Sequence, residues 1–254
     1  MTFQLYTSSP DFNMRRTILI TGASTGIGAA TACHLAQGNT LILHHNQSPI
    51  EPVAEEVRRL GGVVHTSQVD LMDQTGCHSL MQDVASKTEH LDVFVNNAGG
   101  LLKRHVVEEV TWNLMERIFS LNTYSAILLT KLCVPFLRKG SSPSIVNMTS
   151  IAMRHGAPTA TVYGAAKGAM DSFTRGAARE LAPEIRVNAV APGVILTPFH
   201  DRYSTEEKLT NIAGETPVGF NGESNHIAQA IQLLIENTFI TGETSDVNGG
   251  LFTR

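Results

Sequence analysis

The sequence predicts a doubly wound α/β fold of the Rossmann type, in which helices cover both faces of a central parallel sheet of about seven strands. Three observations lead to this expectation. Short apolar runs alternate along the chain with segments of helical pattern. The runs are apolar throughout instead of alternating in polarity, which is typical of strands buried on both faces. A glycine-rich turn joins the first run to the first helix.

The first half of the chain contains four strand candidates, most of them short apolar runs, separated by three helical patterns. TILIT is the first of these runs and LDVFV the fourth. The first helix begins within the glycine-rich turn, and the second ends where Gly61 and Gly62 break its pattern. The expected strands are 17–21, 40–44, 63–69 and 91–95, and the expected helices are 26–37, 51–60 and 74–89.

The second half continues this alternation with longer helices. The longest helical pattern ends just before Gly140, and SIVNM is the apolar run that follows it. Residues 192–222 form a long stretch punctuated by proline and glycine, with no clear element of its own. The expected helices are 111–138, 161–181 and 225–236, and the expected strands are 144–148, 185–190 and a short one near 244–247.

The composition favours one domain. The chain has 254 residues, of which 42% are apolar and 17% charged, and a single core of that size needs no disulfide or metal to hold it. No linker, repeat or change of composition divides it. We expect a flexible N-terminal extension over residues 1–14 and a single domain over residues 15–254.

Several classes of partner are disfavoured. A net charge of −4 with no basic block argues against nucleic acid. No apolar run approaches the roughly 20 residues that cross a bilayer, so we expect no membrane span. Cys33, Cys77 and Cys133 form no CxxC motif, and the ten histidines include no HExxH, so we expect neither a disulfide framework nor a metal site. These features, with no secretory signal, predict a cytoplasmic protein.

The turn after the first strand reads TGASTGIG, from Thr21 to Gly28. Glycines allow a sharp backbone turn and let a pyrophosphate approach without a Cβ in its way. The helix that begins there presents unpaired N–H groups to such an anion. The spacing GxxxGxG differs from the GxGxxG of the commoner dinucleotide fingerprint. Tight packing is the alternative explanation for a glycine-rich turn considered alone.

Together with five further motifs, this turn resembles the pattern of the short-chain dehydrogenase/reductase family. The resemblance covers about residues 15–254, and the motifs appear in the family's order. After the turn come Asn96-Asn97-Ala98-Gly99, Asn122, Ser150, Tyr163-x-x-x-Lys167, and Pro192-Gly193 with Thr197. The resemblance implies an NAD(P)(H)-dependent oxidoreductase that transfers hydride between nicotinamide and a carbonyl compound or secondary alcohol.

The family's catalytic residues correspond to Ser150, Tyr163, Lys167 and Asn122. Tyr163 and Lys167 lie four apart in a helix and therefore share one face. We hypothesise that the ammonium, together with the oxidised nicotinamide, favours the phenolate and prepares Tyr163 to exchange a proton with substrate. Ser150 would donate to the substrate oxygen. The resemblance also implies that Lys167 binds the nicotinamide ribose and that Asn122 holds a water that relays protons to Lys167.

Each of these residues has an ordinary structural interpretation when it is considered alone. A tyrosine and a lysine four apart are common in helices. Ser150 fits a helix cap or a turn, and Asn122 fits a cap or a kink. Their joint presence behind the glycine turn favours catalysis. A nicotinamide-binding sensor without turnover is the rival from another class, and it is disfavoured because such relatives typically lose the tyrosine or the lysine.

The resemblance also implies a set of cofactor contacts. Asp70 is in the position that hydrogen-bonds the adenine amine, although a cap for the helix that starts near Asp73 is an alternative role. Asn97 and Gly99 would border the adenine ribose. Ile195 and Thr197 would reach the carboxamide. The full expected set is Gly22, Ser24, Thr25, Gly26, Ile27, Gly28, His45, Asn46, Asp70, Leu71, Asn97, Gly99, Tyr163, Lys167, Pro192, Gly193, Ile195 and Thr197.

The tip of the second strand decides between NAD(H) and NADP(H). An acidic side chain there accepts from the ribose 2′-OH and repels a 2′-phosphate. No carboxylate occurs from Leu43 to Ile50, and His45 falls at the position of the acid. Neutral His45, Asn46 and Ser48 suit a phosphate, although Thr25 replaces the arginine of many NADP-dependent relatives. NADP(H) is therefore favoured, with NAD(H) possible.

The substrate is expected to be a small molecule that lies over the strand ends beneath residues 194–222. Plausible lining residues are Met153, Arg154, His155, Phe199, His200 and Tyr203, and Arg154 or His155 either meets an anionic substrate or belongs to a solvated loop. A 3-oxoacyl thioester reductase is the related alternative, because Thr216-Pro-Val-Gly219 resembles a run common there. Phe220 replaces the usual arginine, which weakens that alternative. The resemblance further implies a homodimer or homotetramer.

Overall fold

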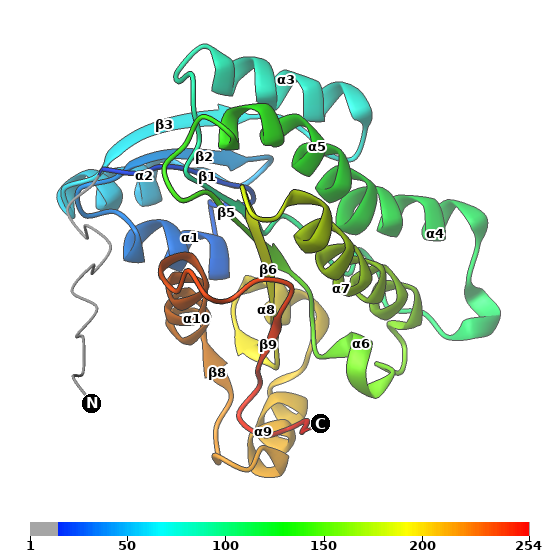
Figure 1. Ribbon diagram of the computed structural model, residues 1–254. Coiled ribbons are helices and arrows are strands. Elements are labelled where there is room, and N and C mark those ends of the chain that lie inside the picture. The colour runs from blue at the N-terminus through cyan, green and yellow to red at the C-terminus, as the bar shows by residue number, and fades with distance from the viewer. Residues whose placement is uncertain (1–14, 254) are drawn as a thin grey trace, which may run out of the picture.

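The computed structural model describes residues 15–253, so the extension expected over residues 1–14 lies outside the described residues. These residues fold around one parallel sheet of seven strands in the order β3-β2-β1-β4-β5-β6-β9 (Figure 1). The predicted fold class is confirmed. The strands are β1 (Thr17–Ile20), β2 (Thr40–His45), β3 (Val63–Gln68), β4 (Val93–Asn96), β5 (Ser144–Met148), β6 (Arg186–Pro192) and β9 (Thr244–Val247).

Two hydrophobic layers cover the sheet, one on each face. Ile18 and Ile20 of β1 pack into the layer with α1 (Gly26–His34), α2 (Glu51–Arg59) and α10 (Ser224–Glu236). Leu19, between them, packs into the opposite layer with α3 (Gln74–Ala85), α5 (Ser125–Leu137) and α7 (Thr161–Leu181). Successive side chains of a strand point to opposite faces, so a strand covered twice must be apolar at every position.

The long helix expected over 111–138 is present, but it is interrupted by a π-helical turn. It consists of α4 (Trp112–Phe119), the π-helical turn η2 (Ser120–Tyr124) and α5. Among the described residues, one helical span, Trp112–Leu137, is long and apolar enough to cross a membrane by length and mean hydropathy alone. The search of the sequence for long apolar runs did not detect it. In this fold, however, the helix lies against α3 and α7, and 44% of its apolar window is buried.

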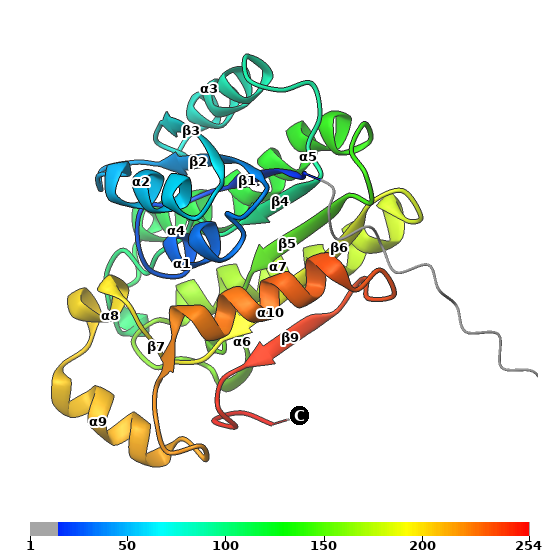
Figure 2. The same cartoon turned by 90° about the vertical axis from the view of Figure 1, so that its left-hand side faces the viewer.

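The stretch 192–222 is more regular than its composition indicates. It holds β7 (Ile195–Leu196), α8 (Pro198–Tyr203) and α9 (Glu206–Glu215), and β7 pairs with β8 (Gly222–Glu223) in a small parallel sheet. This pairing joins the two ends of the segment that contains α8 and α9. Figure 2 shows α8 and α9 on the side toward which β5 and β9 point. The short helices η1 (Val107–Glu109) and α6 (Ala152–His155) lie in the loops after β4 and β5.

Candidate active site

The glycine-rich turn is held in place by the segment that follows β4. Asn97 donates from Nδ2 to the carbonyl oxygens of Thr21 and Gly22 at 2.9 and 3.1 Å. The hydroxyl of Thr21 accepts from the backbone N–H groups of Asn97 and Ala98, each at 3.0 Å. Gly22 adopts a φ of 64°, in the region that glycine enters without strain. The turn and the Asn97 loop therefore form one rigid unit.

A β-carbon cannot be accommodated at Gly28, where it would lie 2.1 Å from the carbonyl oxygen of Gly22. Gly28 is thus required for packing the first turn of α1 against the loop. The helix begins after Thr25, and no side chain caps its first N–H groups. An uncapped helix end facing a cavity is suited to a pyrophosphate.

One cavity of about 980 Å³ extends from this helix end across the edge of the sheet to Tyr163. That volume and the uncapped helix end suit the nicotinamide dinucleotide that the sequence predicts. The expected contacts that line the cavity are Gly22, Ser24, Thr25, Gly26, Ile27, Asn46, Asp70, Leu71, Asn97, Gly99, Ser150, Tyr163, Lys167, Pro192, Gly193, Ile195 and Thr197.

Ser150, Tyr163 and Lys167 converge at one end of this cavity. Ser150 follows β5, and its hydroxyl hydrogen-bonds to that of Tyr163. Lys167 is 3% exposed, and its Nζ lies 5.8 Å from the centre of the Tyr163 ring. Nζ donates to the carbonyl oxygen of Met148 at 2.8 Å. Three of the four expected catalytic residues are therefore brought together, and Ser150 also accepts from the Ala152 N–H, as in the turn interpretation.

Burial perturbs both titratable groups of this set. It raises the pKa of Tyr163 to about 12, against the opposing effect of the Ser150 hydrogen bond. Burial lowers the pKa of Lys167 to about 8, because the ammonium loses its hydration. Perturbed titratable groups within a cavity are typical of catalytic sites.

Asn122 lies within the π-helical turn, and its side chain does not line the cavity. Its Oδ1 accepts from the N–H of Gly100 at 3.0 Å, while Nδ2 donates to the carbonyl oxygens of Gly100 and Ile118 at 2.8 and 2.9 Å. The amide is therefore fully engaged with backbone groups. Oδ1 and the Lys167 Nζ nevertheless both lie within 3.0 Å of where a β-carbon on Gly99 would be.

At the tip of β2 the structure brings His44 to the cavity wall, where the sequence singled out His45. The ring of His45 is 8% exposed and faces the carbonyl oxygen of Ser48 at 3.0 Å. Neighbouring strand residues point to opposite faces, but which of the two faces the turn depends on how β2 packs. Asn46, Gln47 and Ser48 line the wall.

Asp70 is exposed at the other side of this tip, and its Oδ1 accepts from the N–H of Met72 at 3.0 Å. The cap of α3 is Asp73, which accepts from the N–H of Gly76 at 2.8 Å. The alternative of Asp70 as that cap is therefore wrong. On the opposite wall, the Thr197 methyl would lie 3.3 Å from a β-carbon on Gly26, so the residue between β7 and α8 approaches the glycine turn closely.

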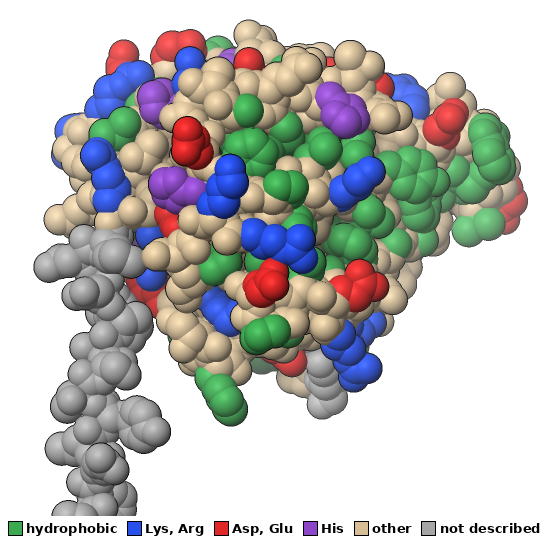
Figure 3. All heavy atoms as spheres, turned by 45° about the horizontal axis from the view of Figure 1, so that its top comes forward, with side chains coloured by type: hydrophobic (Ala, Val, Ile, Leu, Met, Phe, Trp, Pro, Cys, Tyr) green, Lys and Arg blue, Asp and Glu red, His purple; other side chains and the backbone are tan. Residues whose placement is uncertain are grey.

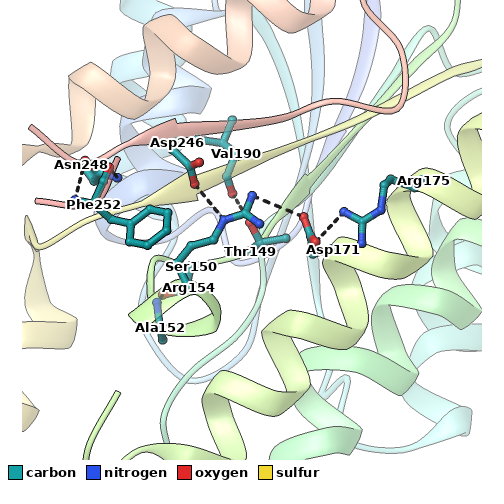
Figure 4. Close-up of polar contacts among 10 residues, drawn as sticks. All are labelled: Thr149, Ser150, Ala152, Arg154, Asp171, Arg175, Val190, Asp246, Asn248 and Phe252. Atoms are coloured by element: carbon teal, nitrogen blue, oxygen red, sulfur yellow. Dashed lines mark hydrogen bonds and ion pairs between the residues drawn. The ribbon is translucent and has the colours of Figure 1, made fainter. Parts of the chain in front are cut away.

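The substrate end is formed by α6, α8 and α9. Of its expected lining residues His155, Phe199 and His200 border the cavity, but Met153, Arg154 and Tyr203 do not. Arg154 points instead toward Asp246 and Asp171, at 3.3 and 3.7 Å (Figure 4). Its guanidinium is therefore engaged inside the protein and is in neither the substrate site nor a solvated loop. Arg104 also borders the cavity, although the sequence pattern did not indicate it.

Comparisons with known proteins agree with this geometry. A family model described as enoyl-(acyl carrier protein) reductase matches residues 22–252. NADPH-dependent aldehyde reductase 1 of Arabidopsis thaliana is 33% identical over 91% of this chain and 84% of its own length. The 3-oxoacyl-[acyl-carrier-protein] reductase FabG of Thermotoga maritima is 33% identical over 92% and 96%. A crystal structure of a short-chain dehydrogenase/reductase, glucose/ribitol dehydrogenase, from Brucella melitensis has a TM-score of 0.86 at 32% identity, covering 96% of this chain and 99% of that one.

Proposed function

The chain belongs to the short-chain dehydrogenase/reductase family and is an oxidoreductase that uses a nicotinamide cofactor, and on that premise we propose that Tyr163 is its general acid and base. The substrate is a small molecule with a carbonyl or a secondary alcohol group. The observation that supports this assignment is the hydroxyl pair of Ser150 and Tyr163, with the buried ammonium of Lys167 behind it.

Each of the three side chains has a separate task. Ser150 donates to the substrate oxygen and fixes its orientation. Tyr163 gives its phenolic proton to that oxygen in reduction and takes it back in oxidation. We infer that the positive charge of the Lys167 ammonium favours the phenolate. Burial alone raises the pKa of the Tyr163 phenol. When bound, the nicotinamide supplies or accepts the hydride. The side-chain amide of Asn122 fixes the backbone of Gly100 and Ile118 next to these three residues.

Replacing Tyr163 by phenylalanine tests this role. We expect kcat to fall by roughly 100- to 10,000-fold while coenzyme affinity stays within a few-fold, because the ring remains but the proton is lost. The matched control is Tyr124→Phe, which removes the hydroxyl of an exposed tyrosine on the π-helical turn. Near-normal turnover by Tyr163→Phe would contradict the assignment.

NADP(H) is the proposed coenzyme. Asn46, Gln47 and Ser48 line the cavity at the tip of β2, and no carboxylate occurs from Leu43 to Ile50. Neutral donors there accommodate a 2′-phosphate that an acidic side chain would repel. Asn46→Asp is expected to shift the ratio of kcat/KM values toward NADH, measured with one carbonyl substrate. A wild-type enzyme that binds NAD⁺ more tightly than NADP⁺ would overturn the proposal.

A 3-oxoacyl thioester reductase is the second candidate, and the FabG relative from Thermotoga maritima favours it. Phe220, which stands where such enzymes usually carry an arginine, is 52% exposed and cannot replace its charge. A panel of ketones, sugars, alcohols and acyl thioesters, assayed with both coenzymes, separates the two candidates. Preference for acyl thioesters by more than tenfold in kcat/KM would select the second.

We also propose a homodimer or homotetramer in the cytoplasm. Hydrophobic side chains lie on the surface around α4 and α5 (Figure 3), and Trp112 and Ile127 are 78% and 37% exposed there. Apolar surface of this kind is typical of interfaces between subunits. Light scattering of the purified protein tests the assembly. The three thiols, none of them in a disulfide, agree with a reducing compartment, which fractionation of the source cells tests.

A further inference from the structure

Arg104 lies in the loop between β4 and η1, on the wall of the substrate end of the cavity. Its side chain is half-buried and is fixed at two points. Nε donates to the carbonyl oxygen of Tyr203 at 2.7 Å, and one terminal nitrogen donates to the hydroxyl of Thr159 at 3.1 Å. Both partners are neutral. Among the side chains that the structure describes, no carboxylate forms an ion pair with this guanidinium.

The backbone around Arg104 is strained on both sides of this contact. Leu102 has a φ of 61° and Thr159 a φ of 65°, a region that branched side chains rarely enter. Each such residue costs of order 1–3 kcal/mol, and residues of this kind persist mainly at functional sites. The two loops are joined further by His105, whose N–H donates to the carbonyl oxygen of Thr159 at 2.9 Å. The fold thus holds Arg104 in one orientation.

Arg104 is hydrogen-bonded to the backbone of a residue, Tyr203, whose ring packs next to the aromatic side chain that covers Tyr163. The ring of Phe199 lies 6.3 Å from that of Tyr163 and 5.0 Å from that of Tyr203. The backbone carbonyl oxygen of Tyr203 accepts the hydrogen bond from the Arg104 Nε. Because Arg104, Phe199 and Tyr163 all line this one cavity, we expect a ligand whose carbonyl reaches Tyr163 to extend along Phe199 toward the guanidinium.

The charge of this end of the cavity differs from that of the whole chain. Arg104, Arg202 and Lys208 line it, against one described acidic residue there, Glu215. The chain as a whole carries −4. A locally positive cleft on an acidic protein attracts anions and raises their rate of association.

We infer that Arg104 is the specificity-determining residue for an anionic substrate, a carbonyl compound that also carries a carboxylate or a phosphate. A planar guanidinium held in one orientation matches either anion with two parallel hydrogen bonds. This inference rests on the proposed oxidoreductase function, because it assigns the substrate class of the same site.

The test compares charged and neutral partners of one carbon skeleton. Oxo acids with the carbonyl at different distances from the carboxylate are assayed against their methyl esters, and dihydroxyacetone phosphate against dihydroxyacetone. Wild type is expected to prefer at least one anion over its neutral partner. In Arg104→Gln that preference falls by roughly 10- to 100-fold, the loss typical of a charge-assisted hydrogen bond, while turnover of the neutral partner stays within a few-fold. The carboxylate and phosphate arms identify which anion is recognised.

Two further variants keep the result interpretable. Arg104→Lys restores the charge without the planar fork and is expected to recover part of the preference. Arg58→Gln removes an exposed charge on α2 and is expected to change nothing. An equal loss for anion and neutral partner in Arg104→Gln would assign Arg104 a structural role only and overturn the inference, as would a wild type that prefers neutral substrates.

Failure of the inference is distinguishable from failure of the proposed function. Turnover of neutral ketones that Tyr163→Phe abolishes supports the function even when anions have no advantage. When no compound is turned over, calorimetry of the same acids and of dihydroxyacetone phosphate with the enzyme–NADPH complex decides the inference. Binding to wild type and not to Arg104→Gln supports it, and no binding to wild type overturns it.

Discussion

The imidazole of His44 accepts a hydrogen bond of 3.1 Å at Nδ1 from the backbone N–H of Gly22. With Nδ1 as acceptor, the ring proton is on Nε2, which donates to the carbonyl oxygen of Val69 at 3.1 Å. One side chain at the end of β2 thereby joins the glycine turn after β1 to the end of β3. Burial lowers the pKa of His44 to about 4, so the neutral ring that this arrangement requires is present at neutral pH.

His44 makes stability depend on pH in a defined window. The unfolded chain binds a proton at this residue near its ordinary pKa of 6.5, whereas the folded chain binds it only near 4. Stability from this group is therefore present above pH 6.5 and is lost as the pH falls toward 4, by about 3 kcal/mol in total. Urea unfolding from pH 4 to pH 8 is expected to show this loss in wild type and a smaller one in His44→Gln. The control His78→Gln alters an exposed histidine on α3 and should keep the wild-type slope.

Gly28 and Gly176 give opposite results when each is replaced by alanine. A β-carbon at Gly28 would meet the carbonyl oxygen of Gly22, so Gly28→Ala must displace the glycine turn. We expect loss of coenzyme binding, measured by quenching of protein fluorescence, together with lower stability. Gly176, within α7, has open space at the same point, and its replacement should stabilise the protein by about 0.5–1 kcal/mol. Normal coenzyme affinity in Gly28→Ala would contradict the packing argument.

Lys167 is expected to support activity while its buried ammonium lowers stability below pH 10.5. Its pKa is lowered from 10.5 to about 8 by burial, so between these values the unfolded chain binds more protons than the folded one. The free energy of unfolding contributed by this residue therefore rises with pH through that window. Lys167→Met is expected to lose the rise, seen in denaturant titrations at pH 7.5 and pH 10, and to lower kcat by roughly 100-fold or more. If the free energy of unfolding of Lys167→Met rises with pH as steeply as that of wild type, the Lys167 ammonium is solvated and not buried.

The ion pairs of Arg154 should stabilise the fold without contributing to substrate recognition. Arg154, Asp171 and Asp246 have side chains 17%, 9% and 17% exposed, and they join α6, α7 and β9 (Figure 4). Arg154→Met leaves two buried carboxylates without this partner and is expected to cost about 3 kcal/mol of stability. Arg138→Met breaks an exposed pair with Glu184 and should cost less than about 1 kcal/mol. The relative kcat/KM for anionic and neutral substrates should stay unchanged in Arg154→Met, unlike in Arg104→Gln.

Patterns that depend on neighbouring residues were predictable. The unbroken apolar runs, the glycine turn and the Tyr163–Lys167 spacing are all local, and the structure places each where it was expected. The π-helical turn at Asn122 was missed because its apolar pattern is that of one continuous helix. In the structure the Asn122 side chain bonds to the backbone of Gly100, which is distant in sequence, so no local pattern contains that contact.

The sequence by itself determined the order of the elements, the two-sided burial of the sheet and the residues able to exchange a proton, because periodicity and residue chemistry are properties of short segments. Only the tertiary structure decided that His44 and not His45 faces the glycine turn, that Arg154 is held in ion pairs, and that Arg104 meets Thr159 at the substrate end. Each of those contacts joins residues 22 to 92 positions apart in sequence. Such contacts depend on how strands and loops pack in three dimensions, which no local pattern specifies.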